Sequence, residues 1–257
     1  MTRLKKHLGQ NLLIDKNIIA KETALAGDIG NSIVLEIGPG TGMLTKELAK
    51  HAKKVIAIEK DPEILEEAKR EVESGNVEWI LADAMKMEWP KFDKMVANLP
   101  YYLSSEIIFK LLEHKFETAV LICQKEFGER MAGRPGKNYS RLTVNAQLRA
   151  NVELCGAVSK TCFIPIPKVD SVIVRLTPKE TELPEIFEPL TRAVFSHKKK
   201  LLKNALVDSS GELGLSKEEA KELFKGLEKR AIELRPEQIL ELAWKIQEQL
   251  AKRQGKS

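Results

Sequence analysis

The first half of the chain alternates short runs of β-branched and aliphatic residues with longer stretches in which apolar residues recur at helical spacing. The short runs predict buried strands, and the longer stretches predict amphipathic helices. The predicted strands cover residues 33–37, 54–58, 77–80, 94–97 and 119–123, and the predicted helices cover residues 43–51, 62–72 and 105–114. Strands separated by helices connect through right-handed crossovers, so we expect an α/β fold with a mostly parallel sheet covered on both faces.

The pattern changes after residue 150. Residues 152–158 and 172–176 alternate like strands without a helix between them, so we expect an antiparallel pair at the sheet edge. Beyond Pro178 only helical patterns remain, with a capping-box sequence at Ser216 and a helix-initiating proline at Pro236. We therefore expect a large α/β domain at residues 1–178 and a small all-helical domain at residues 179–257.

The composition is that of a globular protein. Of the 257 residues, 43% are hydrophobic and 31% are charged, which excludes disorder as the main state. The mean hydropathy is −0.26, and no apolar run approaches the roughly 18 residues that a membrane span needs, so we expect no membrane association. The basic start of the chain is not followed by an apolar segment, so we expect no secretory leader and a cytoplasmic protein.

Basic residues are concentrated in three parts of the chain. The net charge of +5, with a pI near 8.9, is modest, so position matters more than the total. The candidate contacts to a nucleic-acid phosphate backbone come from the start of the chain, from residues 125–149 and from residues 197–203, with Lys168 in addition. They are Lys5, Lys6, Arg130, Arg134, Lys137, Arg141, Lys168, Lys198, Lys199, Lys200 and Lys203. Any one cluster can be an ordinary solvated face, whereas three clusters together suit a phosphate backbone.

The cysteines indicate neither a disulfide framework nor a metal site. Cys123, Cys155 and Cys162 form no C-x-x-C pair, and no histidine lies at metal-ligand spacing from them. Cys123 stands in an apolar run, where we expect a small buried side chain.

A glycine-rich turn, Gly38-Pro-Gly40-Thr-Gly42, follows the first predicted strand of the sheet. Acidic residues follow the next two strands: Glu59 can accept hydrogen bonds from ribose hydroxyls, and Asp83 can accept one from an adenine amino group. Taken singly, the turn can be a tight strand-to-helix connection and either acid a helix cap. Together at the carboxyl ends of the strands, they predict a site for an adenosine-bearing ligand.

The charge beside this turn bears on the identity of the ligand. A dinucleotide site prefers G-x-G-x-x-G, whereas here the third glycine comes one residue early. Glu36 precedes the turn, where a carboxylate repels a pyrophosphate but favours an ammonium group. S-adenosylmethionine carries an ammonium and a sulfonium and no phosphate, so it fits better than NAD.

The fourth strand ends in Asn98-Leu99-Pro100-Tyr101. The Asn98 side-chain oxygen and the Leu99 carbonyl can each accept one N–H of an adenine amine and so aim its lone pair at a methyl donor. Pro100 holds Leu99 extended, and Tyr101 can stack on the extruded base. The alternative is a strand-ending turn with a buried tyrosine.

Two prolines stiffen the segment from Phe163 to Ser171. Phe163 either closes the second face of the extruded base or belongs to the ordinary core.

With these motifs, the chain resembles the KsgA-type small-subunit ribosomal RNA adenine dimethyltransferases, which are relatives of the Erm antibiotic-resistance methyltransferases. The resemblance extends from about Lys5 to Leu250 and rests on residues 8–13, 36–42, 98–101 and 163–171. It implies a Rossmann-like class I methyltransferase sheet that binds S-adenosylmethionine, with residues 1–30 capping the cofactor. The implied cofactor residues are Asn11, Leu13, Gly38, Glu59, Asp83 and Asn98, to which the residue chemistry adds Glu36 and Gly40. Leu12 stands where the family often has phenylalanine.

The resemblance also implies the substrate: two adjacent adenosines near the 3′ end of small-subunit rRNA, dimethylated during biogenesis of the immature small ribosomal subunit. Residues 195–206 resemble the family's basic helix, and residues 230–238 its late helical signature, which argues against an Erm-type enzyme of large-subunit rRNA. Another alternative is an assembly or transcription factor that acts mainly by binding RNA. We expect a monomer without a metal ion.

Overall fold

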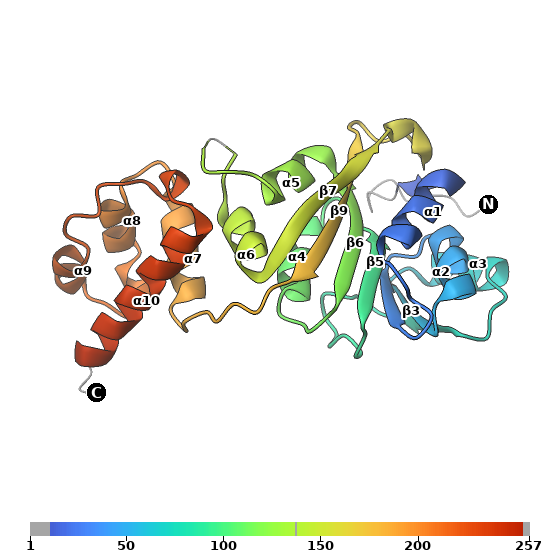
Figure 1. Cartoon of the computed structure of the whole chain (residues 1–257), viewed down its shortest axis with the longest axis horizontal. Helices are drawn as coiled ribbons and strands as arrows, with labels where there is room; N and C mark the ends of the chain where they lie inside the picture. Colours follow the sequence, from blue (N-terminus) through green and yellow to red (C-terminus); the bar gives the residue numbers. More distant parts are fainter. Residues whose placement is uncertain (1–10, 137, 254–257) are drawn as a thin grey trace. The chain divides into compact units, whose positions relative to one another are not determined.

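The computed structural model describes residues 11–136 and 138–253, and the chain forms two compact units (Figure 1). The first unit comprises Met1–Glu129 and Ala150–Pro178, and the second comprises Arg130–Arg149 and Lys179–Ser257. No helix in the described ranges is both long and apolar enough to cross a membrane.

A seven-stranded sheet, in the order β4-β3-β2-β5-β6-β9-β7, forms the centre of the first unit (Figure 1). Its strands are β2 (Ile33–Ile37), β3 (Lys54–Glu59), β4 (Val77–Leu81), β5 (Lys94–Asn98), β6 (Thr118–Gln124), β7 (Ala150–Val158) and β9 (Ser171–Pro178). The first five are parallel, and β9 pairs antiparallel with both β6 and β7. The predicted parallel sheet with an antiparallel pair at its edge is therefore confirmed. The chain builds outward from β2 through β3 to β4 and then returns to place β5 on the other side of β2, which creates a switch point where ligands bind in such sheets.

Helices cover the first unit's sheet. They are α1 (Lys16–Leu25), α2 (Met43–His51), α3 (Pro62–Glu71), α4 (Ser104–Leu111) and α5 (Lys125–Met131), the last of which spans the boundary of the unit. Val34, Val55 and Val96 on one face pack in a core with residues of α1 and α2. Because side chains alternate along a strand, their neighbours Leu35 and Ile56 face the other way, and these are buried too. Both faces are covered, as predicted.

Local sequence explains where several helices begin. Asp61 caps α3, accepting a hydrogen bond from the backbone N–H of Glu63 at 3.0 Å, and Pro62 occupies the first turn. Helix α1 was not among the helices predicted from the sequence, although Asp15 caps it by accepting from the N–H groups of Asn17 and Ile18. The predicted helix at residues 105–114 is shorter than expected and ends at Leu111.

Two short strands lie outside the main sheet. β1 (Leu12–Leu13) pairs antiparallel with β8 (Phe163–Ile164), which follows the 3-10 turn η2 (Lys160–Cys162). The three cysteines are free, and Cys123 is fully buried, as predicted; burial raises the pKa of its thiol to about 12.

The second unit is helical. It contains α6 (Arg141–Arg149), α7 (Phe187–Ser196), α8 (Leu202–Asp208), α9 (Lys217–Leu223) and α10 (Pro236–Arg253), with 3-10 turns η3 (Ser210–Leu213) and η4 (Ala231–Glu233). The predicted capping box is present at α9: Ser216 Oγ accepts from the Glu219 N–H at 3.3 Å, and Glu219 Oε2 accepts from the Ser216 N–H at 2.8 Å. Pro236 begins α10, as predicted.

The division of the chain differs from the expected one at residues 130–149. The sequence pattern predicted a single α/β domain at residues 1–178, but Arg130–Arg149 belongs to the helical unit. The reason is packing: Val144 and Leu148 of α6 are buried in the same core as Phe187 of α7 and Ile239 of α10. The helical unit is therefore built from two separate stretches of the sequence.

Candidate active site

A cavity of about 850 Å³, including the solvent space at its mouth, lies in the first unit at the carboxyl ends of four parallel strands. Ile37 of β2, Glu59 of β3, Asn98 of β5 and Ile122 of β6 each contribute to its wall. The predicted site residues that line it are Asn11, Gly38, Gly40, Glu59, Asp83, Asn98, Leu99, Pro100, Tyr101 and Phe163. Residues from both ends of the first unit's sequence thus meet at one cavity.

The glycine turn approaches the N-terminal segment closely. Gly38 and Gly40 have φ angles of 72° and 56°, in the left-handed region that disfavours other residues. A Cβ atom on Gly40 would lie 2.6 Å from Leu12 Cδ2, which is closer than real Cβ contacts allow. Glycine at position 40 therefore permits both the backbone conformation and the approach of Leu12.

Glu59 is held by the backbone that follows it. Its Oε1 atom accepts hydrogen bonds from the N–H groups of Lys60 at 2.9 Å and Asp61 at 3.0 Å. Burial raises the pKa of the carboxyl group above its ordinary value, although these two bonds oppose the shift. Asp83 lies beyond β4, where its Oδ1 accepts from the N–H of Met85 at 2.9 Å. Both carboxyl groups are thus fixed at the cavity wall.

Asn98 is the last residue of β5, and its Oδ1 atom is buried. Within the described part of the chain, no hydrogen-bond donor reaches this oxygen. Buried polar atoms without a partner are rare, and they cost free energy unless a bound molecule satisfies them. The arrangement fits a ligand that brings an N–H group to the end of β5.

The residues after Asn98 are fixed by their own contacts. The Leu99 N–H donates to the Ile122 carbonyl at 3.0 Å, which ties the turn to β6. The Tyr101 hydroxyl and Ser171 Oγ share a hydrogen bond of 2.6 Å. Burial raises the pKa of Tyr101, so its hydroxyl stays protonated in the neutral range. These contacts fix the positions of Leu99 and Tyr101 at the cavity wall.

Phe163 is part of the core under α1 and α2, and it also contributes to the cavity wall. Its side chain is buried, with 2% exposed. It faces Leu13 across the β1–β8 pair. Two residues 150 positions apart are thus brought together beside the site.

Leu13 and Glu36 are not among the residues that line the cavity. Leu13 is buried in the core, and Glu36 is 1% exposed, with Oε2 accepting from Thr45 Oγ1 of α2 at 2.6 Å. Burial raises the pKa of Glu36 to about 8, the Thr45 bond opposes this, and the charge of Glu59 adds to it. The side chain of Glu36 therefore links β2 to α2, the two elements that the glycine turn connects.

Lys60 and Tyr102 line the cavity but were missed by the sequence analysis. The Lys60 ammonium lies 4.9 Å from the ring centroid of Tyr102 and donates a hydrogen bond to its hydroxyl. Each of them directly follows a predicted site residue, Glu59 or Tyr101, and this was the available signal.

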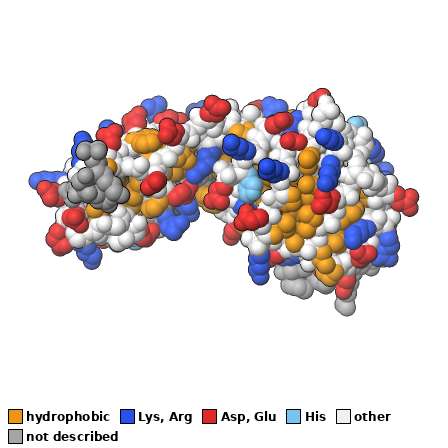
Figure 2. Space-filling model, turned by 90° about the horizontal axis from the view of Figure 1, so that it is seen from below, with side chains coloured by type: hydrophobic (Ala, Val, Ile, Leu, Met, Phe, Trp, Pro, Cys, Tyr) orange, Lys and Arg blue, Asp and Glu red, His pale blue; other side chains and the backbone are white. Residues whose placement is uncertain are grey.

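The structure separates the predicted RNA-contacting residues into several groups. Lys5, Lys6 and Lys137 lie outside the described residues. Arg134, Lys168, Lys198 and Lys199 are exposed, and Arg130 is partly buried. Lys200 and Lys203 form ion pairs with Asp208 and Glu228, both at 2.6 Å. In the face shown in Figure 2, acidic side chains lie among the basic ones on each unit.

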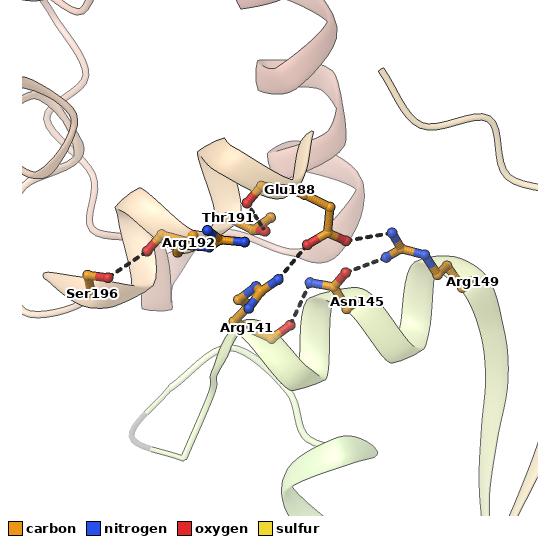
Figure 3. Close-up of polar contacts among 7 residues, drawn as sticks. All are labelled: Arg141, Asn145, Arg149, Glu188, Thr191, Arg192 and Ser196. Atoms are coloured by element: carbon orange, nitrogen blue, oxygen red, sulfur yellow. Dashed lines mark hydrogen bonds and ion pairs between the residues drawn. The ribbon is translucent and has the colours of Figure 1, made fainter. Parts of the chain in front are cut away.

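Arg141 forms an ion pair that the sequence did not predict. Its Nη2 atom donates to Glu188 Oε2 at 2.6 Å, and Arg149 Nη2 donates to Glu188 Oε1 at the same distance (Figure 3). Arg149 also donates to Asn145 Oδ1 on the same helix. Arg141 therefore links α6 to α7 within the helical unit.

The chain matches known proteins along most of its length. A sequence model of the family described as "Ribosomal RNA adenine dimethylase" matches residues 1–247. A protein of Thermococcus gammatolerans named "Probable ribosomal RNA small subunit methyltransferase A" is 48% identical over 245 residues, which make up 93% of this chain and 88% of that protein. A protein of the same name from Pyrococcus furiosus is 44% identical over 91% of this chain and 89% of its own length.

Solved structures agree with the sequence matches. A dimethyladenosine transferase from Plasmodium falciparum superposes with a TM-score of 0.80 at 37% identity, covering 92% of this chain and 98% of that one. The 23S rRNA methyltransferase ErmE superposes with a TM-score of 0.70 at 29% identity, covering 92% and 99%. These neighbours confirm the predicted Rossmann-like methyltransferase fold. The chain belongs to the ribosomal RNA adenine dimethylase family.

Proposed function

We propose that the chain uses S-adenosylmethionine to dimethylate two adjacent adenosines near the 3′ end of small-subunit rRNA, acting as a cytoplasmic monomer on the immature subunit. The observation that carries the proposal is the buried Oδ1 atom of Asn98 at the wall of the cavity, which accepts no hydrogen bond from the residues that the structure describes. The names of the relatives from Thermococcus gammatolerans and Pyrococcus furiosus support the choice of small-subunit rRNA.

The residues that line the cavity fit S-adenosylmethionine, the methyl donor. Glu59 accepts hydrogen bonds from the ribose hydroxyls, and Asp83 accepts one from the adenine amino group. Gly38 and Gly40 bring backbone close to the ligand, and Asn11 lines the same cavity. When bound, the cofactor supplies an electrophilic methyl group on a positively charged sulfur.

Asn98 and Leu99 act on the amine of the substrate adenine. The Asn98 Oδ1 atom and the Leu99 carbonyl each accept one N–H, which draws the nitrogen towards tetrahedral geometry and frees its lone pair for the methyl carbon. Pro100 fixes the direction of the Leu99 carbonyl. The methylated amine is acidic enough to lose its proton to water, so catalysis consists mainly of positioning and electrostatic stabilisation.

Tyr101 and Phe163 hold the extruded base between them. The hydrogen bond between Tyr101 and Ser171 sets the position of one ring, and core packing sets the position of the other. Aromatic side chains stabilise an unstacked base because they replace the stacking that it loses.

Basic residues of both units contact the rRNA backbone in this proposal. In the helical unit, Lys198 and Lys199 are exposed. Lys200 and Lys203 exchange their carboxylate partners for phosphates, which costs little because surface ion pairs are weak.

Methyl transfer from tritiated S-adenosylmethionine to unmethylated small ribosomal subunits tests the proposal. We expect dimethyladenosine in the nucleoside digest, two modified nucleotides next to each other, and no incorporation with Asn98→Ala. If the native chain incorporates no label, or labels another base, the proposal is wrong.

Two alternatives predict different results. A factor that acts mainly by binding RNA would support normal subunit maturation in cells that carry Asn98→Ala. An Erm-type enzyme would methylate large-subunit rRNA instead, and mapping the labelled nucleotide distinguishes the two RNAs.

A further inference from the structure

Large apolar side chains are exposed on the loop that follows Phe163. Ile164, Ile166 and Val169 are 50%, 63% and 45% exposed. Ile14 is exposed too, and its N–H donates to the carbonyl of Cys162, the residue before the loop, at 2.9 Å. Single exposed apolar residues are ordinary, but a cluster on one short loop indicates a surface that a partner covers.

Both ends of this loop, residues 163–171, are fixed. The Lys160 N–H donates to Asp170 Oδ1 at 3.0 Å, and the Lys125 N–H donates to the Asp170 carbonyl at 3.0 Å. The first end is held by the β1–β8 pair, and Pro167 within the loop is buried. The exposed side chains are therefore presented by a preorganised loop, which lowers the entropy cost of binding.

The loop is continuous with the cavity. Phe163 and Ile164 are successive residues of β8, so their side chains point to opposite sides: Phe163 into the cavity wall and Ile164 outward. Leu12, which faces Ile164 across the strand pair, also lines the cavity. Lys168 on the same loop is exposed and provides a positive charge for a phosphate.

We propose that Ile164, Ile166 and Val169 form an apolar wedge that packs against the bases flanking the target adenosine after it has left its stack. An extruded base leaves a gap in the RNA, and proteins that unstack bases often fill such gaps with isoleucine, leucine or proline side chains. Since only the target base enters the cavity, a wedge at the cavity's edge meets its neighbours. This inference rests on the proposed function.

Extrusion is measured with an RNA hairpin in which 2-aminopurine replaces the first of the two adjacent adenosines. The fluorescence of this base rises when it unstacks, and it lacks the 6-amino group, so it is not methylated. The native chain, with S-adenosylmethionine present, is compared with Ile166→Ser, with the conservative Ile166→Leu and with Leu154→Ser. Leu154→Ser is the matched control, because Leu154 is also an exposed apolar residue but lies on β7, outside the loop.

We expect Ile166→Ser to lose most of the fluorescence increase at saturating protein and to lower kcat on small subunits roughly tenfold. Ile166→Leu and Leu154→Ser should behave like the native chain, and the affinity for S-adenosylmethionine should stay the same in all of them. A native-like fluorescence increase with Ile166→Ser refutes the wedge, as does the absence of any increase with the native chain. Failure of the proposed function is a separate result, because it appears as absence of methyl transfer by the native chain.

Discussion

The Glu188 carboxylate links two helices of the second unit, and its removal gives a well-defined prediction. Glu188 accepts one hydrogen bond from Arg141 and one from Arg149, each at 2.6 Å, so that it joins α7 to α6 (Figure 3). Glu188→Gln keeps the size of the side chain but removes the charge. The amide also turns an N–H group towards one of the two guanidinium groups, which repels it.

The cost follows from the exposure of the three side chains. Hydrogen bonds to charged groups contribute about 1.5–3 kcal/mol when buried, and exposed ion pairs contribute about 0.2–1 kcal/mol. Glu188 is 38% exposed, Arg141 is 30% exposed and Arg149 is 18% exposed, so each bond lies between these limits. We expect Glu188→Gln to lower the free energy of unfolding by about 2 kcal/mol. For a helical unit of roughly 100 residues, this lowers the Tm of that unit by roughly 8–16 °C.

The Glu188 carboxylate should also make the stability of the folded state depend on pH. Burial alone would raise the pKa of Glu188, but the hydrogen bond from Arg141 and the charge of Arg149 outweigh it and hold the pKa below its ordinary value. A carboxyl group whose pKa is lowered by folding stabilises the folded state when the pH is above the unfolded pKa of about 4.3. This stabilisation is lost as the pH falls through the folded pKa. The difference in Tm between the native chain and Glu188→Gln should therefore be largest at neutral pH and become smaller at acidic pH.

Calorimetry of the native chain, Glu188→Gln and Glu185→Gln measures these effects. Glu185 is an exposed carboxylate three residues earlier, so its variant controls for the loss of one charge. Equal Tm values for the native chain and Glu188→Gln at neutral pH would refute the reasoning. So would a Tm difference that persists unchanged at about pH 3.

The remaining predictions concern the cavity and the basic cluster. Glu59→Ala should weaken S-adenosylmethionine binding by roughly 1.5–3 kcal/mol, about 10- to 150-fold in Kd, and an unchanged Kd in isothermal titration would contradict the ribose role. Tyr101→Ala should lower kcat but retain cofactor affinity, and full turnover would show that the ring does not hold the base. Reversing the charges at residues 198–200 should weaken small-subunit binding and flatten its salt dependence; an unchanged salt slope excludes phosphate contacts there. Burial raises the pKa of Glu36 to about 8, so its stabilising protonated form is lost as pH rises through that value. Between the unfolded pKa of about 4.3 and the folded pKa, the native chain should therefore lose stability as the pH rises, and Glu36→Gln should not share this loss. We expect the Tm of Glu36→Gln to fall less than that of the native chain between about pH 5 and 8, and parallel Tm curves would contradict this.

Local patterns in the sequence were sufficient for most of the sheet and part of the site. Strand and helix periodicity depends on neighbouring residues, so β2, α2 and β3 begin where the pattern predicts. The carboxyl ends of parallel strands share one edge, so the predicted parallel direction of the strands was enough to expect Gly38, Glu59 and Asn98 at one cavity.

Only the tertiary structure decided which distant residues became partners. Arg141 was predicted as one of several candidate RNA contacts, and nothing in the sequence indicated its hydrogen bond to Glu188, which lies 47 positions further along the chain. The assignment of Arg130–Arg149 to the helical unit likewise depends on Leu148 packing against a core formed much later in the sequence. Burial and ion pairing are properties of the assembled chain, and periodicity records only which side of an element is apolar, so the sequence by itself could not name these partners.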